Sequence, residues 1–112
     1  MQISIKGADP SIIERLKKLQ RSTYEDKRLY ANLDAAFDKL KENPYFGDRI
    51  QKKRIPKFYI DKYGIDNLLV APLPGAWRLL YSVVRSEDNI MVIIVDFMAH
   101  TEYDRMFGYS RK

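Results

Sequence analysis

The amino-acid sequence predicts an α+β domain, in which one strand and a helical hairpin precede a three-stranded antiparallel meander. Residues 2–6 alternate apolar and polar side chains, as a short half-buried strand does. Residues 10–43 repeat apolar side chains at helical spacing, and residues 67–98 contain three β-rich runs separated by turn signals. We therefore expect a four-stranded sheet with both helices packed on one of its faces.

Capping signals delimit the two expected helices. Asp9, followed by a proline, starts the first helix, because its carboxylate can accept hydrogen bonds from first-turn amides. Ser22 and Glu25 have capping-box spacing and start the second helix, which ends at Asn43-Pro44. Whether these are two helices or one bent rod stays open. Their apolar stripes are Ile12, Ile13, Leu16 and Leu19, then Leu29, Leu33, Ala36, Phe37 and Leu40.

The second half of the chain is expected to be β structure. Strands are predicted at residues 67–73, 76–85 and 90–98, with turns at 74–75 and 86–89. Alternation places Trp77, Leu79, Tyr81 and Val83 on one face of the middle strand and Arg78, Leu80, Ser82 and Val84 on the other. The last strand is apolar almost throughout, which favours an interior position in the sheet.

Composition excludes several classes of protein. The 112 residues suit a single domain, 1–112. The absence of cysteine excludes disulfide frameworks, thiolate nucleophiles and zinc fingers, and the single histidine argues against a histidine-rich metal site. The start of the chain lacks an apolar signal core, and no apolar run approaches the roughly 20 residues of a membrane span. We expect a soluble cytoplasmic protein without metal or cofactor.

The net charge of +5 comes from one short segment, residues 49–63, which holds six basic residues and one acidic residue. It lies within a stretch, 43–66, that lacks convincing periodicity and is expected to be a long functional loop. Basic side chains interleaved with aromatic ones suit an RNA or DNA backbone whose bases stack on the rings. A solvated basic loop that contacts an acidic protein is the alternative. The segment contains Arg49, Lys52, Lys53, Arg54, Lys57 and Lys62, with Phe58, Tyr59 and Tyr63.

Arg78 is an obligate cation in the middle of an apolar strand. Burying it unpaired is costly, so it must reach a partner, water or a ligand. The structural alternative is an ion pair with Asp96 or Glu102.

His100 follows the last strand, where an imidazole can act as a general acid or base near neutral pH. A lone histidine is also often just a satisfied polar residue. Tyr103 and Tyr109 can donate a proton, stack on a base or cover the core. No Walker loop, dinucleotide-binding glycine pattern or GxSxG motif is present.

The order of elements and two strings resemble the RelE/ParE superfamily of toxins from type II toxin–antitoxin modules. The strings are PGAWRLLYSV at 74–83 and VIIVDFMAHTEY at 92–103, and the basic segment precedes them as it does in that family. The aromatic-Arg-Leu-x-Tyr pattern at 77–81 is the most specific element. The ending HTEYDRMFGY departs from the family's commoner His-Arg-x-x-x-Tyr form.

The resemblance implies a metal-independent endoribonuclease that cuts mRNA, on the ribosome in many members, by attack of the ribose 2′-hydroxyl. It implies a cognate antitoxin as partner, and no membrane or small-molecule cofactor. The implied catalytic residues are Arg78, His100, Lys53 and either Tyr103 or Tyr109, and the implied RNA-binding residues are Arg49, Lys52, Arg54, Lys57 and Tyr109. Three alternatives stay open: a ParE-type gyrase inhibitor, an inactive antitoxin-binding member, and a generic basic scaffold.

Overall fold

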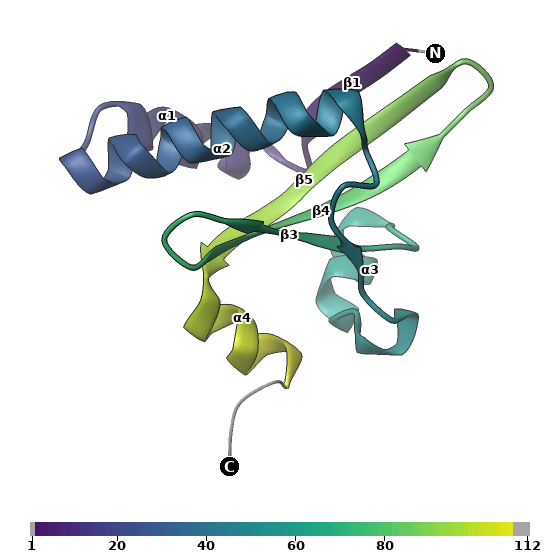
Figure 1. The fold of residues 1–112 in the computed structure, drawn as a ribbon. Coiled ribbons are helices and arrows are strands. Elements are labelled where there is room, and N and C mark those ends of the chain that lie inside the picture. The colour runs from purple at the N-terminus through teal and green to yellow at the C-terminus, as the bar shows by residue number, and fades with distance from the viewer. Residues whose placement is uncertain (1, 109–112) are drawn as a thin grey trace.

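A five-stranded mixed sheet organises the fold, with helices on both of its faces (Figure 1). The structure is a computed structural model that describes residues 2–108. Its elements are β1 (Gln2–Gly7), α1 (Pro10–Gln20), α2 (Tyr24–Glu42), β2 (Asp48–Arg49), the 3₁₀ helix η1 (Lys52–Arg54), α3 (Lys57–Tyr63), β3 (Leu69–Leu73), β4 (Trp77–Arg85), β5 (Asn89–Ala99) and α4 (His100–Phe107). The predicted α+β class is confirmed.

The strands run in the order β1-β5-β4-β3-β2. The predicted meander is confirmed, since β3, β4 and β5 pair antiparallel in sequence order. β1 pairs parallel to β5, and α1 and α2 supply the crossover that a parallel pair requires. The prediction of four strands is wrong, because Asp48 and Arg49 pair with Val70 and Leu69 as a fifth strand. A two-residue strand is too short to show a period in the sequence.

The helix boundaries largely follow the capping chemistry. Asp9 caps α1 as predicted, and its carboxylate accepts a hydrogen bond from the Ser11 amide at 2.8 Å. The capping box predicted at Ser22 is wrong by one residue, because Thr23 caps α2 and accepts from the Asp26 amide at 3.1 Å. Both pairs have the same three-residue spacing, so the pattern alone could not separate them. The two helices are distinct and are separated at residues 21–23.

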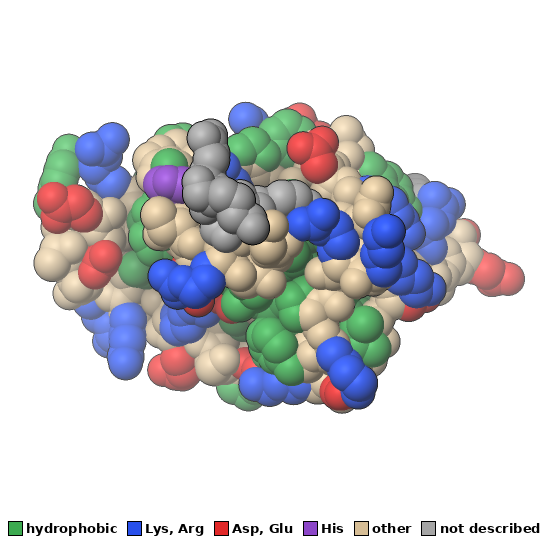
Figure 2. Space-filling view, turned by 90° about the horizontal axis from the view of Figure 1, so that it is seen from below, with side chains coloured by type: hydrophobic (Ala, Val, Ile, Leu, Met, Phe, Trp, Pro, Cys, Tyr) green, Lys and Arg blue, Asp and Glu red, His purple; other side chains and the backbone are tan. Residues whose placement is uncertain are grey.

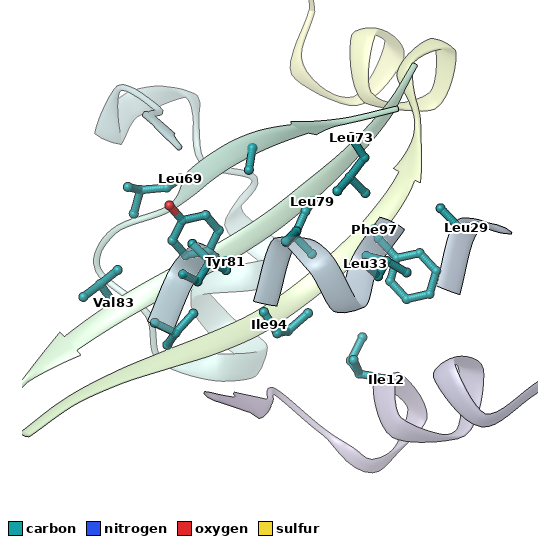
Figure 3. Close-up of a cluster of buried hydrophobic side chains, with 14 of the residues drawn as sticks. Ile12, Leu29, Leu33, Leu69, Leu73, Leu79, Tyr81, Val83, Ile94 and Phe97 are labelled. Carbon is teal, nitrogen blue, oxygen red and sulfur yellow. The ribbon is translucent and has the colours of Figure 1, made fainter. Parts of the chain in front are cut away.

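The larger core lies between the sheet and the helices α1 and α2 (Figure 3). The stripe predicted for α2 is buried there, with Phe37 partly covered, whereas Ile13 of α1 is 42% exposed. The sheet contributes the predicted face of β4 and alternate residues of β5. Residues of this core with almost no exposed surface include Leu33, Leu40, Ala71, Leu79, Tyr81 and Val92.

A second core covers the opposite face of the sheet. The two predicted helices, α1 and α2, do pack on one face, but the sequence did not predict the helices that cover the other face. Leu80 of β4 and Val95 and Met98 of β5 are apolar on this face and need a cover. α3, α4 and the residues Ile50 and Ile55 on either side of η1 provide it, with Tyr59 and Phe107 among the buried contacts. The stretch expected to be a long loop therefore contains a strand, a 3₁₀ turn and a helix. No helix within residues 2–108 is long and apolar enough to cross a membrane.

Candidate active site and basic face

Arg78 lies at the start of β4, half-buried on the face that α4 covers. Its guanidinium donates to the Trp77 carbonyl at 3.2 Å, and its Cζ lies 5.9 Å from the centroid of the Tyr103 ring. Both carboxylates considered as its partners are engaged elsewhere. Asp96 pairs with Arg15 at 2.6 Å, and Glu102 pairs with Arg105 at 2.5 Å. Within residues 2–108, Arg78 therefore forms no ion pair.

His100 is the first residue of α4 and is exposed. Its backbone amide donates to the Ala76 carbonyl at 2.8 Å, which ties the start of α4 to the β3–β4 turn. Arg78 is paired with Met98 in the antiparallel β4–β5 ladder, two residues before His100. The register therefore places Arg78 and His100 at the same end of the sheet.

Tyr103 lies in the second core with only 7% of its surface exposed. Its ring stacks on Phe107 with centroids 4.6 Å apart and an interplanar angle of 24°. The same ring lies beside the Arg78 guanidinium. The main role that this geometry gives Tyr103 is to hold α4 against the sheet and to support Arg78 with an aromatic surface.

Lys53 and Arg54 lie in η1, near the opposite end of α4. The Arg54 guanidinium donates to the Phe107 carbonyl at 2.5 Å and so ties η1 to the last turn of α4. Lys53 is exposed. Because α4 has eight residues, its two ends are separated by about 10 Å. The structure thus places Tyr103 beside Arg78, and Arg78 and His100 at the same end of the sheet, whereas Lys53 lies next to Arg54, which contacts the far end of α4.

The basic segment contains both free and neutralised charges. Arg49 of β2 and Lys52 and Lys53 of η1 are exposed and form no ion pair within the described part of the chain. Lys57 instead pairs with Asp61 at 2.7 Å, and Lys62 lies 3.5 Å from the Asp9 carboxylate. The three free cations are thus the stronger candidates for phosphate contacts.

Figure 2 shows the face that carries α3 and α4, with the single histidine and several Lys and Arg side chains on it. We call the surface that carries Arg78, His100, Lys52 and Lys53 the basic face. Arg49 is not part of it, because Arg49 pairs with Leu69, whose side chain belongs to the larger core on the other side of the sheet. Tyr109, predicted to contact RNA, lies outside the described residues.

The aromatic residues of the basic segment have different environments. Phe58 is 53% exposed and is available for stacking on a base, whereas Tyr59 is 2% exposed and is not. Tyr63 is half-buried and donates to Asp9 at 2.8 Å. The sequence interpretation missed Tyr45 and Phe46, which are exposed just before β2. Both residues lie in the stretch 43–66 that was expected to be a functional loop, and this position could have marked them as candidates for base stacking.

Asp9 anchors α3 to the start of α1. Hydrogen bonds from the side chains of Ser11 and Tyr63 hold the pKa of the Asp9 carboxyl well below its usual range, and the Lys62 ammonium lowers it further. Burial and the bond to Asp9 raise the pKa of the Tyr63 hydroxyl. Lys62 therefore serves the fold, although the sequence grouped it with the cations of the basic segment.

The candidate site contains the Arg78 guanidinium and the exposed His100 imidazole, and further cations that form no ion pair with any described residue lie in residues 49–53. Groups of these kinds can bind a phosphodiester and move a proton. Within residues 2–108, no three His, Asp or Glu side chains are gathered to hold a metal ion. Comparisons with protein-family models, curated proteins and solved structures found no match to the chain. The resemblance to RelE/ParE toxins therefore stays a prediction from the sequence.

Proposed function

We propose that this protein is the toxin of a type II toxin–antitoxin module, a metal-independent endoribonuclease that cuts mRNA in the cytoplasm. The observation that carries the proposal is Arg78. It is a half-buried guanidinium without a carboxylate partner among the described residues, at the same end of the sheet as the exposed His100. A half-buried cation of this kind is well suited to stabilise the negative charge that develops on a phosphate in a transition state.

In the proposed reaction, the ribose 2′-hydroxyl attacks the adjacent phosphorus and the bond from phosphorus to the 5′-oxygen breaks. His100 accepts the proton of the 2′-hydroxyl, and Arg78 stabilises the negative charge on the non-bridging oxygens. The products are a 2′,3′-cyclic phosphate and a 5′-hydroxyl. RNA supplies its own nucleophile, so the protein needs only a base, an acid and a cation.

The 5′-oxygen leaves with a proton from an acid. Tyr103 and Tyr109 are the two candidates that the resemblance gives. The near-complete burial of the Tyr103 ring favours Tyr109 as the acid. Arg49, Lys52 and Lys53 bind the backbone of the RNA away from the scissile phosphate.

The cognate antitoxin completes the proposal. Its chemistry is expected to complement the basic face, with an acidic or apolar segment that folds on binding. Copurification of a small acidic protein encoded beside this chain tests this part.

The decisive experiment incubates the purified protein with end-labelled single-stranded RNA in EDTA, both free and as mRNA on ribosomes. We expect cleavage products with 2′,3′-cyclic phosphate ends. Arg78→Ala should lower the rate by roughly 10²–10³-fold, the usual cost of removing one transition-state donor. Arg85→Ala is the matched control, because Arg85 is exposed at the other end of the same strand.

Three outcomes contradict the proposal: no cleavage of free or ribosome-bound RNA, cleavage that EDTA abolishes, or full activity of Arg78→Ala. Inhibition of DNA supercoiling with RNA left intact would replace it with the gyrase alternative.

A further inference from the structure

A small pocket lies between α2 and the β3–β4 turn, on the side of the sheet opposite Arg78. Its volume is about 170 Å³, below the roughly 300–1,000 Å³ of pockets for drug-sized ligands, so it suits a single planar ring system. Figure 1 shows the β3–β4 turn beneath the N-terminal half of α2. The lining residues are Glu25, Arg28, Leu29, Asn32, Pro74, Gly75 and Trp77.

The lining combines apolar surfaces with exposed charged side chains that form no ion pair within residues 2–108. Leu29 is buried, and the Trp77 ring is half-buried and packs against Phe97. Glu25 and Arg28 are one helical turn apart, yet they form no ion pair with each other or with any other described residue. The Arg28 guanidinium instead lies 5.9 Å from the ring centroid of Tyr24. The Glu25 carboxylate, an acceptor, and the Arg28 guanidinium, a donor, thus both border the pocket and belong to no ion pair among the described residues.

Strand β4 lies between this pocket and the candidate active site. Trp77 lines the pocket, and Arg78 is the next residue on the opposite face of β4. The Ala76 carbonyl accepts the hydrogen bond from the His100 amide. Ala76 has a φ of 62°, a left-handed conformation that a residue with a Cβ rarely adopts. Such backbone strain tends to occur at functional sites.

We propose that this pocket binds a guanine base of the RNA. The inference rests on the proposed function and adds a substrate preference to it. Arg28 donates to guanine O6 and N7, the pairing most often seen for arginine and guanine. The Glu25 carboxylate accepts from N1–H and the exocyclic amine, and the Trp77 ring supplies an aromatic surface. Uracil lacks the exocyclic amine and fills less of the pocket.

The test uses Trp77 as its reporter, because it is the only tryptophan in the chain. The purified protein is titrated with GMP, AMP, CMP and UMP, with inner-filter correction against a free tryptophan derivative. We expect saturable quenching by GMP, with an apparent Kd at least fivefold below that for UMP. Glu25→Gln should reduce this preference to less than twofold, and Arg28→Gln should weaken GMP binding at least fivefold.

Glu42→Gln is the matched control, since it makes the same change at the other end of α2, outside the pocket, and should leave GMP binding unchanged. Quenching that does not saturate, that is equal for the four nucleotides, or that Glu25→Gln leaves unchanged would overturn the inference. Nucleotide binding involves no cleavage, so its failure is distinguishable from failure of the nuclease proposal. If the protein cuts RNA but does not bind GMP, the proposal of a guanine-binding pocket is refuted and the nuclease proposal is not.

Discussion

Arg15 and Asp96 form an ion pair of 2.6 Å where β5 extends beyond the end of β1. The same guanidinium donates to the Phe97 carbonyl at 2.9 Å and lies 4.0 Å from the centroid of the Phe97 ring. From α3, the Tyr59 hydroxyl donates to the other oxygen of Asp96 at 3.2 Å. Asp96 thus links α1 and α3 to the sheet, and it is not available to Arg78.

Replacing Asp96 with asparagine should destabilise the fold by about 1 kcal/mol, because the ion pair is only partly exposed and Tyr59 loses a charged acceptor. Urea unfolding followed by Trp77 fluorescence measures this. Asp61→Asn removes the exposed ion pair to Lys57 and should cost about 0.3 kcal/mol. Equal losses in the two variants would contradict the role of Asp96 as a link between elements.

The parts of the fold that could be predicted depend on local patterns. The helices and the three long strands have clear periodicity and capping residues, and the structure confirms them with boundary shifts of one or two residues. β2 has two residues and exists only through its pairing with β3. α3 and α4 are short, and their apolar residues find partners on the second face of the sheet. Those partners are distant in sequence, so no local pattern predicts them.

The candidate site shows the same division. Alternation along β4 correctly placed Arg78 on the face opposite Trp77, because that depends on one strand. The sequence could not predict that Arg78 forms no ion pair with Asp96, because the partner of Asp96 is Arg15, which lies 81 positions away in the chain. The same holds for Lys62, whose contact with Asp9 depends on how α3 docks against α1. Which cations form ion pairs therefore depends on the tertiary structure, and local sequence patterns do not predict it.

Binding of single-stranded RNA should depend on salt through the cations of the basic segment that form no ion pair among the described residues. The variant with Arg49, Lys52 and Lys53 replaced by glutamine should bind more weakly. Its plot of log K against log salt should be shallower by about 2, since each phosphate contact contributes roughly 0.7 to the slope. Filter binding of a 2′-O-methyl RNA, which cannot be cleaved, measures both quantities.

The matched control replaces Lys17, Lys18 and Arg21, exposed cations at the end of α1, with glutamine. It lowers the net charge equally and should leave the slope nearly unchanged. If the two triple variants behave alike, RNA binding depends on net charge alone and the basic segment is not the binding surface.

His100 should carry proton transfer without contributing to RNA binding. His100→Gln should lower the cleavage rate by about 10²–10⁴-fold, the usual contribution of a general base or acid, while affinity for the uncleavable RNA stays within twofold. Because His100 is exposed, added imidazole should reach the vacated position and restore part of the rate. Thr101→Ala alters the neighbouring exposed residue and should keep full activity. Loss of affinity, or no rescue by imidazole, would argue that His100 serves the structure of α4.

Alkaline pH should destabilise the protein through Tyr59. Burial and the nearby Asp96 carboxylate raise the pKa of the Tyr59 hydroxyl above its usual range. A group whose pKa is higher in the folded state stabilises the fold fully below its unfolded pKa, here about 10, and loses that contribution as the pH rises toward the folded value. The free energy of unfolding should therefore decline above about pH 10, and each such tyrosine contributes up to about 1.4 kcal/mol per pH unit.

Tyr59→Phe should have opposite effects at the two ends of this range. At neutral pH it removes the hydrogen bond to Asp96 and should cost about 1 kcal/mol. Above pH 10 it should make the decline less steep, because one hydroxyl no longer has to ionise. Tyr24→Phe is the control, since Tyr24 is 74% exposed, and it should leave both values unchanged. Urea unfolding from pH 7 to 11 measures these effects, and an unchanged alkaline slope in Tyr59→Phe would show that Tyr59 does not determine it.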